Sequence, residues 1–136
     1  MAEYMFKKLV KEQGLENNFE IDSAATSREE IGNDIYPPAK KCLMLHNVPF
    51  ERHFARQITR NDIDYYGYIL AMEDFNINNL TRMFGLSNKI KRLLDFTDSP
   101  RNISDPWCTG DFEKAYSEIE EGVLAFLRNA NRKTQE

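Results

Sequence analysis

Tyr68-Ile69-Leu70-Ala71-Met72 is an uninterrupted apolar run near the middle of a chain of 136 residues. It has the length of a strand, and a run without polar alternation is typical of a parallel strand that is covered on both faces. A helix is predicted directly after it, at residues 74–84, and a further strand at residues 90–96. A strand, a helix and a strand in this order predict a parallel sheet with helices on its faces, so we expect an α/β fold.

The N-terminal half adds helices and one more strand to this prediction. Apolar residues at helical spacing predict a helix at residues 2–12, and a short strand is expected at residues 19–25. Two prolines open a predicted helix at residues 37–45, because the first helical turn tolerates proline. Thr59 is predicted to cap a short helical turn together with Asp62. A chain of this length is expected to form one domain, residues 1–136, with a three-layer α/β/α architecture.

Composition excludes several classes of protein. The net charge of −4 comes without a basic block, which argues against a nucleic-acid partner. No apolar run reaches the ~18 residues of a membrane span, and the N-terminus lacks the pattern of a signal peptide, so we expect a cytoplasmic protein. Cys42 and Cys108 are too few and too far apart in sequence to predict a zinc site, and we expect them to be free thiols.

One loop near the C-terminus carries a candidate catalytic acid. In the sequence Ile-Ser-Asp-Pro-Trp-Cys-Thr-Gly-Asp-Phe, residues 103–112, Pro106 keeps Asp105 in an extended conformation. A carboxylate fixed beside the aromatic Trp107 would suit a general acid acting on a flat substrate. The alternative is an ordinary Asx-Pro turn that precedes a helix.

The same loop leads into the last predicted helix. Asp111 is expected to be its N-cap, and the amphipathic pattern predicts a helix over residues 112–128. Residues 129–136 are predicted to be a frayed tail.

Five sequence blocks resemble, in order and in spacing, those of the low-molecular-weight protein-tyrosine phosphatases. The blocks are Met1-Ala2-Glu3-Tyr4-Met5-Phe6, Ile21-Asp22-Ser23-Ala24-Ala25-Thr26, His53-Phe54-Ala55-Arg56-Gln57-Ile58-Thr59, Tyr68-Ile69-Leu70-Ala71-Met72-Glu73 and Asp105-Pro106-Trp107. The resemblance implies the α/β fold of that family. It also implies hydrolysis of a phosphotyrosine protein or small phosphate ester through a cysteinyl-phosphate, without a metal or cofactor.

The resemblance further implies that part of the family's site is missing. In the family the nucleophile lies in a Cys-x5-Arg loop between the first strand and the first helix, which corresponds to a position just before Met1. Val48 follows Cys42, and Lys114 follows Cys108, at the position of the arginine. We therefore expect a chain that lacks the first, interior strand and the phosphate loop, that begins at an internal methionine of a longer frame, and that is inactive.

Two other functions are alternatives to a truncated phosphatase. One is a non-catalytic relative of the family that evolved without the loop and binds a protein partner. The other is an arsenate reductase on the same fold, which is disfavoured because that chemistry needs the same loop cysteine and a relay of further thiols.

The resemblance assigns roles to the remaining site residues. Asp105 corresponds to the general acid that protonates the leaving tyrosine oxygen and later deprotonates the attacking water. Trp107 corresponds to an aromatic wall of the phosphotyrosine slot. Cys108 and Glu29 stand where the family usually has aromatic residues, which leaves the substrate preference open.

Two further residues correspond to a shell that supports the phosphate loop. Ser23 and His53 match residues that hydrogen-bond this loop, and Glu73 replaces an aspartate that is common after the third family strand. For His53 the alternative is an ordinary loop histidine, near Arg52 and Arg56, whose hydrogen bonds are satisfied locally. Finally, a missing interior strand would expose two sheet edges, so we expect a homo-oligomer, most simply a dimer.

Overall fold

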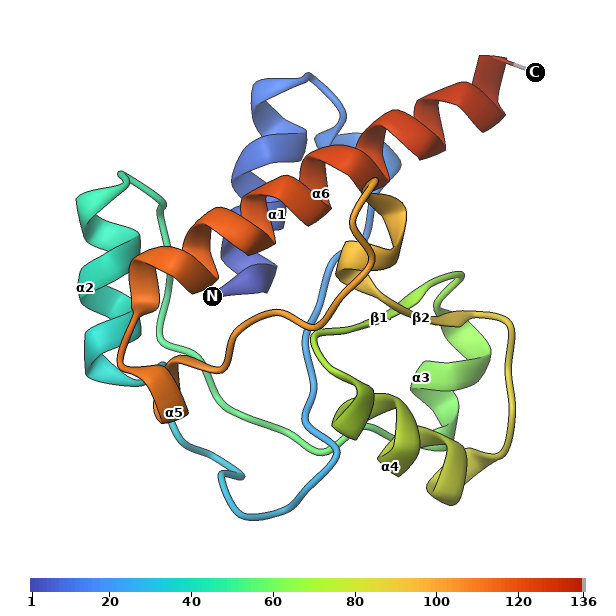
Figure 1. Ribbon diagram of the computed structural model, residues 1–136, viewed down its shortest axis with the longest axis horizontal. Helices are drawn as coiled ribbons and strands as arrows, with labels where there is room; N and C mark the ends of the chain where they lie inside the picture. The colour runs from blue at the N-terminus through green and yellow to red at the C-terminus, as the bar shows by residue number, and fades with distance from the viewer. Residues whose placement is uncertain (136) are drawn as a thin grey trace.

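The computed structural model describes residues 1–135, except for the side chains of residues 107, 108 and 131–135. Its elements follow one another from the N-terminus, coloured blue in Figure 1, to the C-terminus, coloured red. They are α1 (Ala2–Glu12), η1 (Glu16–Asn18), α2 (Pro37–Leu45), α3 (Arg60–Tyr65), β1 (Ile69–Ala71), α4 (Asp74–Phe84), β2 (Ile90–Arg92), η2 (Leu93–Phe96), α5 (Pro106–Thr109) and α6 (Phe112–Gln135). Among the described residues no helix is long and apolar enough to cross a membrane.

The sheet is parallel, as the strand–helix–strand pattern predicts. β1 pairs with β2 in a register that places Ile69 opposite Ile90 and Ala71 opposite Arg92. Helix α4 connects the two strands and packs on both of them. The second strand is shorter than predicted because the chain turns into η2 after Arg92, whose N–H donates a hydrogen bond to Asp95 Oδ2 at 3.0 Å.

The predicted strand at residues 19–25 is wrong for most of its length. Among these residues only Ala25 pairs, in an isolated parallel bridge with Gln57. Ala25 donates its N–H to Arg56 O and accepts a bond from Ile58 N–H, each at 2.8 Å. Residues 19–24 are not assigned to a strand. A strand requires a neighbour along its whole length, and the structure provides one only at Ala25.

The predicted helix boundaries that rest on local chemistry are confirmed. Thr59 and Asp62 form a capping box at the start of α3. Asp111 Oδ1 accepts a hydrogen bond from Lys114 N–H at 2.9 Å at the start of α6. Helix α6 continues to Gln135, beyond the predicted end at residue 128, so residues 129–135 of the predicted tail belong to this helix, and Glu136 lies outside the described residues.

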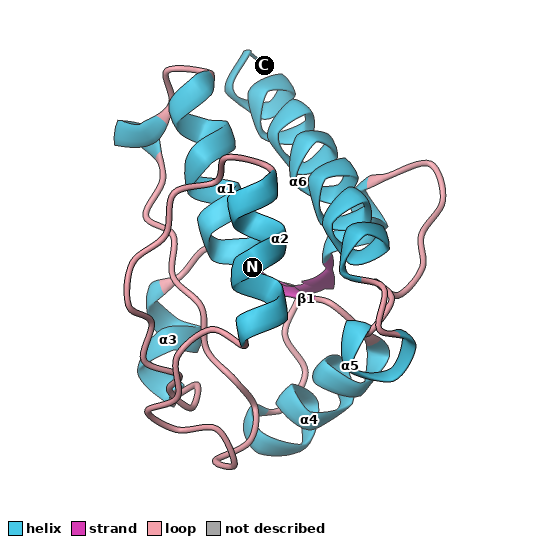
Figure 2. Cartoon of the chain, turned by 90° about the vertical axis from the view of Figure 1, so that its left-hand side faces the viewer, coloured by secondary structure: helices cyan, strands magenta, loops and turns pink. Residues whose placement is uncertain are grey.

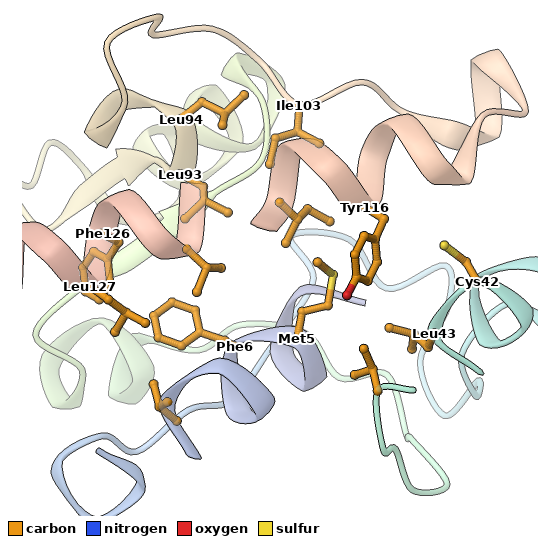
Figure 3. Close-up of a cluster of buried hydrophobic side chains, with 14 residues drawn as sticks. Met5, Phe6, Cys42, Leu43, Leu93, Leu94, Ile103, Tyr116, Phe126 and Leu127 are labelled. Carbon is orange, nitrogen blue, oxygen red and sulfur yellow. The ribbon is translucent and has the colours of Figure 1, made fainter. Parts of the chain in front are cut away.

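The hydrophobic core lies between α6 and the elements that pack against it, namely α1, α2 and η2 (Figures 2 and 3). Helix α6 buries Tyr116, Ile119, Val123, Phe126 and Leu127, which recur at the spacing of one helix face. The core side chains that they meet from the other elements are Met5, Phe6, Val10, Cys42, Leu43, Leu93 and Leu94. Packing in this core fixes the position of α1, whose N-terminal end lines a cavity.

Candidate functional site

A cavity of about 1000 Å³ lies where several parts of the chain meet. Its walls include the N-terminal end of α1, the extended segment 19–24, parts of the segment 53–66, the region of β1 and the segment 103–106. Phe126 of α6 also lines it. In Figure 1 the segment that follows η1 runs through the centre of the molecule.

The β1 side of this cavity consists partly of backbone. Ile69 donates its N–H to Lys89 O at 3.0 Å, and Ile69 and Ala71 therefore direct their peptide groups toward β2. Because peptide groups alternate along a strand, those of Leu70 point to the other side, where Leu70 lines the cavity. Phe19, Ile21, Leu70 and Met72 are only partly buried, although all of them line the cavity and pack against the core.

The cavity brings together three of the predicted site residues. Ser23, His53 and Asp105, which are far apart in the sequence, all line it. Glu29, predicted at the mouth of the substrate slot, is exposed and is not among the described residues that line this cavity. The side chains of Trp107 and Cys108 lie outside the described part of the structure.

Asp105 is positioned by hydrogen bonds on both sides of it. Ile103 N–H donates to Met72 O at 2.9 Å, which ties the loop to the residue after β1. The N–H of Ser104 donates to Glu118 Oε1 of α6 at 3.0 Å. Asp105 O accepts a bond from Thr109 N–H at 3.1 Å, because Pro106 starts the short helix α5 there. These contacts place the Asp105 backbone at one end of the cavity.

Glu73 is a second carboxyl group beside Asp105. It precedes α4, and its N–H donates to Asn76 Oδ1 at 3.1 Å. Burial raises the pKa of Glu73, and the negative charges of Asp105 and Asp74 raise it further. A carboxyl group with a raised pKa therefore lies beside Asp105 at the cavity, and perturbed carboxyl groups are common at sites of acid–base chemistry.

Ser23 is held by Glu3, a residue that the sequence did not identify. Ser23 donates its hydroxyl hydrogen to Glu3 Oε1 at 2.6 Å, while Glu3 Oε2 lies 2.7 Å from Lys7 Nζ. Glu3 stands in the first turn of α1, where the helix dipole favours a carboxylate. The position of Glu3 in the first helical turn could have been recognised from the sequence, but its contact with Ser23 depends on the tertiary fold.

Asp34, which the sequence analysis also missed, holds the loop that carries His53. Asp34 Oδ1 accepts hydrogen bonds from His53 N–H at 2.9 Å and from Ile35 N–H at 2.7 Å. Its other oxygen pairs with Lys40 and lies 3.1 Å from Arg52 Nη1. Lys40 first, and then the His53 amide, hold the pKa of Asp34 well below its usual range. The bond to His53 is made by its backbone N–H, so Asp34 fixes the path of this loop.

The charges around the cavity are mainly negative. Arg56, which lines it, pairs with Asp22 at 3.0 Å and with Asp62 at 2.8 Å. The α-ammonium of Met1 also lies at the cavity, and burial lowers its pKa. The acidic side chains that line the cavity are Glu3, Glu20, Asp22, Asp62, Glu73 and Asp105.

Cys42 lies in a different environment. Its side chain is part of the core, with the residue only 3% exposed, and Sγ lies 3.6 Å from Phe112 O and 3.7 Å from Glu113 Oε1. Burial and the neighbouring Glu113 raise the pKa of the Cys42 thiol to about 11. A nucleophilic cysteine needs the opposite shift, because the thiolate is the reactive form.

Comparison with known proteins identifies the family. The family model described as low molecular weight phosphotyrosine protein phosphatase matches residues 1–136. The low molecular weight protein-tyrosine-phosphatase YfkJ of Bacillus subtilis is 34% identical over 139 residues, which cover 99% of this chain and 89% of that protein. The human low molecular weight phosphotyrosine protein phosphatase is 37% identical over 141 residues, covering 96% of this chain and 87% of its own length.

Solved structures agree with this comparison. The crystal structure of YfkJ from Bacillus subtilis has a TM-score of 0.92 and 33% identity, and the match covers 97% of this chain and 86% of the other. The fold and the sequence therefore lead to the same assignment. The chain belongs to the low molecular weight phosphotyrosine protein phosphatase family.

Proposed function

We propose that the cavity is a site for phosphotyrosine monoester hydrolysis and that Asp105 is its general acid. The observation that carries the proposal is that Ser23, His53 and Asp105, from three distant segments, line one cavity in a member of this family. Tyrosine has a pKa of about 10, so its oxygen leaves poorly at neutral pH unless a proton is supplied. Asp105 donates that proton as the P–O bond breaks, and the resulting carboxylate then accepts a proton from the water that attacks the phosphoenzyme.

The nucleophile of this reaction is not supplied by Cys42. Its thiol is buried, is protonated at neutral pH and does not line the cavity. Cys-x5-Arg does not occur within residues 1–136. The acidic groups around the cavity would also repel a phosphate dianion. Phosphate binding normally requires a loop whose N–H groups converge on the anion. The 136-residue chain by itself is therefore proposed to be inactive.

The cavity supports a specific place for such a loop. An extended strand beside Leu70 could pair with the peptide groups that face the cavity and cover the partly buried Phe19, Ile21 and Met72. Its C-terminal end would then carry the loop toward the start of α1, where helical N–H groups favour an anion. A cytoplasmic location fits this proposal, because a thiolate nucleophile needs a reducing compartment.

The test compares two proteins with p-nitrophenyl phosphate as substrate. Residues 1–136 alone should show no turnover above background. The same chain preceded by an apolar strand and a Cys-x5-Arg loop should be active, and a matched control in which that loop cysteine is serine should not. Turnover by residues 1–136 that disappears in Asp105→Ala would contradict the inactivity. An inactive but folded extended chain would instead favour the non-catalytic relative.

A further inference from the structure

A second cluster of reactive side chains lies outside the cavity, between α2 and α6. Cys42 and His46 are four residues apart at the C-terminal end of α2, and Glu113 stands in the first turn of α6. Residues four apart share one helix face, so the thiol and the imidazole both meet the carboxylate across the helix contact. The Sγ atom, a ring nitrogen and a carboxylate oxygen all lie within 4.8 Å of one another.

Two of these separations can be compared with those of a tetrahedral metal site, and they involve the two different oxygens of the Glu113 carboxylate. Zinc bonds of about 2.0–2.3 Å place neighbouring ligand atoms roughly 3.3–3.6 Å apart. Cys42 Sγ lies 3.7 Å from Glu113 Oε1. His46 Nε2 lies 2.6 Å from Glu113 Oε2, a hydrogen-bond distance that would have to open by less than about 1 Å for both atoms to bind the metal.

The ring of His46 is already fixed in position. It stacks on Tyr116 of α6, with ring centroids 3.7 Å apart and planes inclined by 10°. His46 and Glu113 reach solvent, with side chains 34% and 60% exposed, so an ion can enter from outside. Cys42 forms the buried end of the cluster, shown on α2 in Figure 3.

We propose that Cys42, His46 and Glu113 bind a zinc ion that joins α2 to α6, with water as the fourth ligand. A thiolate and an imidazole favour zinc over magnesium or calcium, which prefer ligand sets made of oxygen. Cys42 binds as the thiolate, so its proton is released to solvent as the S–Zn bond forms, and His46 binds through a neutral imidazole. Counting cysteines alone could not predict this site, because only one of its ligands is a thiol.

The test uses cobalt(II) as a spectroscopic substitute for zinc, added to the full 136-residue chain. We expect binding of one ion per chain, with a thiolate-to-cobalt charge-transfer band and the visible bands of tetrahedral cobalt. Cys42→Ser should abolish the charge-transfer band, whereas Cys108→Ser, the matched control, should retain it. Glu113→Gln, an exposed change that leaves the core intact, should weaken cobalt binding by about tenfold or more.

Zinc should also raise the melting temperature of the chain, because it binds the folded state, and a chelator should reverse the effect. Calorimetry in buffers of different ionisation enthalpy should detect the released thiol proton. No charge-transfer band in the unmodified chain would overturn the proposal. A band lost in Cys108→Ser but retained in Cys42→Ser would overturn it as well. If Cys42→Ser fails to fold, Glu113→Gln decides, and unchanged affinity in that variant contradicts the site.

Discussion

Gly122 of α6 lies directly against Leu93, the first residue of η2. A Cβ atom added to Gly122 would lie 2.5 Å from Leu93 Cγ and within 3.3 Å of both Leu93 Cδ atoms. Leu93 is only 1% exposed and belongs to the central core. The missing side chain at residue 122 therefore lets α6 approach the end of the sheet closely, and this contact keeps the core together.

Gly122→Ala should destabilise the protein. In a free helix the change would be favourable by roughly 1 kcal/mol. Here the new methyl group must displace Leu93, and overpacking a core costs about 1–3 kcal/mol. Denaturant unfolding should show a net loss of stability, while Ser117→Ala on the exposed face of the same helix should change it by about 0.5 kcal/mol or less. A more stable Gly122→Ala variant would mean that η2 moves away at little cost.

Cys42 should react slowly with alkylating reagents at neutral pH. Its pKa of about 11 lies above the ordinary value of 9.0, because burial and Glu113 disfavour the thiolate. The fold therefore favours the protonated thiol, and this contribution to stability is present below pH 9 and is lost as the pH rises toward 11. In a Cys108→Ser background the alkylation rate should increase steadily up to that pH. Rapid alkylation at pH 7 would instead indicate an activated thiol.

Asp34 should stabilise the protein only while it is ionised. Its pKa in the folded state lies below the ordinary 3.8, chiefly because of Lys40 and the His53 amide. Its contribution is therefore present above pH 3.8 and is lost as the pH falls through the folded-state pKa. Asp34→Ala should lower the melting temperature at pH 7, and the difference from the unmodified chain should shrink in strong acid. Asp98→Ala, at an exposed aspartate, is the control, and an equal effect of the two changes would contradict this role.

Asp105 should matter most for poor leaving groups. In the chain extended by a strand and a Cys-x5-Arg loop, Asp105→Ala should reduce kcat for phenyl phosphate by roughly 10²–10⁴. The loss should be smaller for p-nitrophenyl phosphate, because a nitrophenolate needs less help from an acid. Measuring kcat for both esters separates proton donation from a general loss of structure, which would slow both reactions equally. Equal rates for the unmodified and Asp105→Ala proteins would remove Asp105 from the mechanism.

Local chemistry decided which features of the fold the sequence could predict. Thr59 with Asp62, and Asp111 before α6, satisfy helix N–H groups within a few residues, so their sequence is sufficient. Residues 19–24 have strand composition, but pairing depends on a neighbour that only Ala25 finds. The length of the last helix was likewise underestimated. The helix continues beyond the amphipathic pattern because the residues that follow also have helical propensity.

The site was less accessible to sequence reasoning than the fold. Asp105 was indicated by its place before Pro106 and Trp107, whereas Ser23 and His53 were indicated by family resemblance alone. Nothing in the spacing of the three residues indicates that they meet. Glu3 and Asp34 were missed because their partners, Ser23 and His53, are 20 and 19 residues away in the chain. Such contacts depend on tertiary structure, which a periodic pattern does not record.

The cavity beside β1 predicts self-association of the chain. Apolar side chains on its walls, Phe19, Ile21, Leu70 and Met72, are only partly buried, and the peptide groups of Leu70 face away from β2. An open strand edge and apolar area left exposed to water both cost free energy. A second copy of the chain that covers this opening would remove both costs, because exposed sheet edges commonly pair with another chain.

We therefore expect residues 1–136 to form a dimer at micromolar concentration, measured by light scattering. Adding an apolar strand before residue 1 should fill the cavity and shift the protein toward a monomer, whereas Leu86→Lys, a change at a residue that is 92% exposed and does not line the cavity, should leave the dimer intact. If the 136-residue chain is instead a monodisperse monomer with a cooperative melt, the cavity must be tolerated within one chain. If Leu86→Lys dissociates the dimer, residue 86 lies at or near the interface, and the interface is not the one proposed at the cavity.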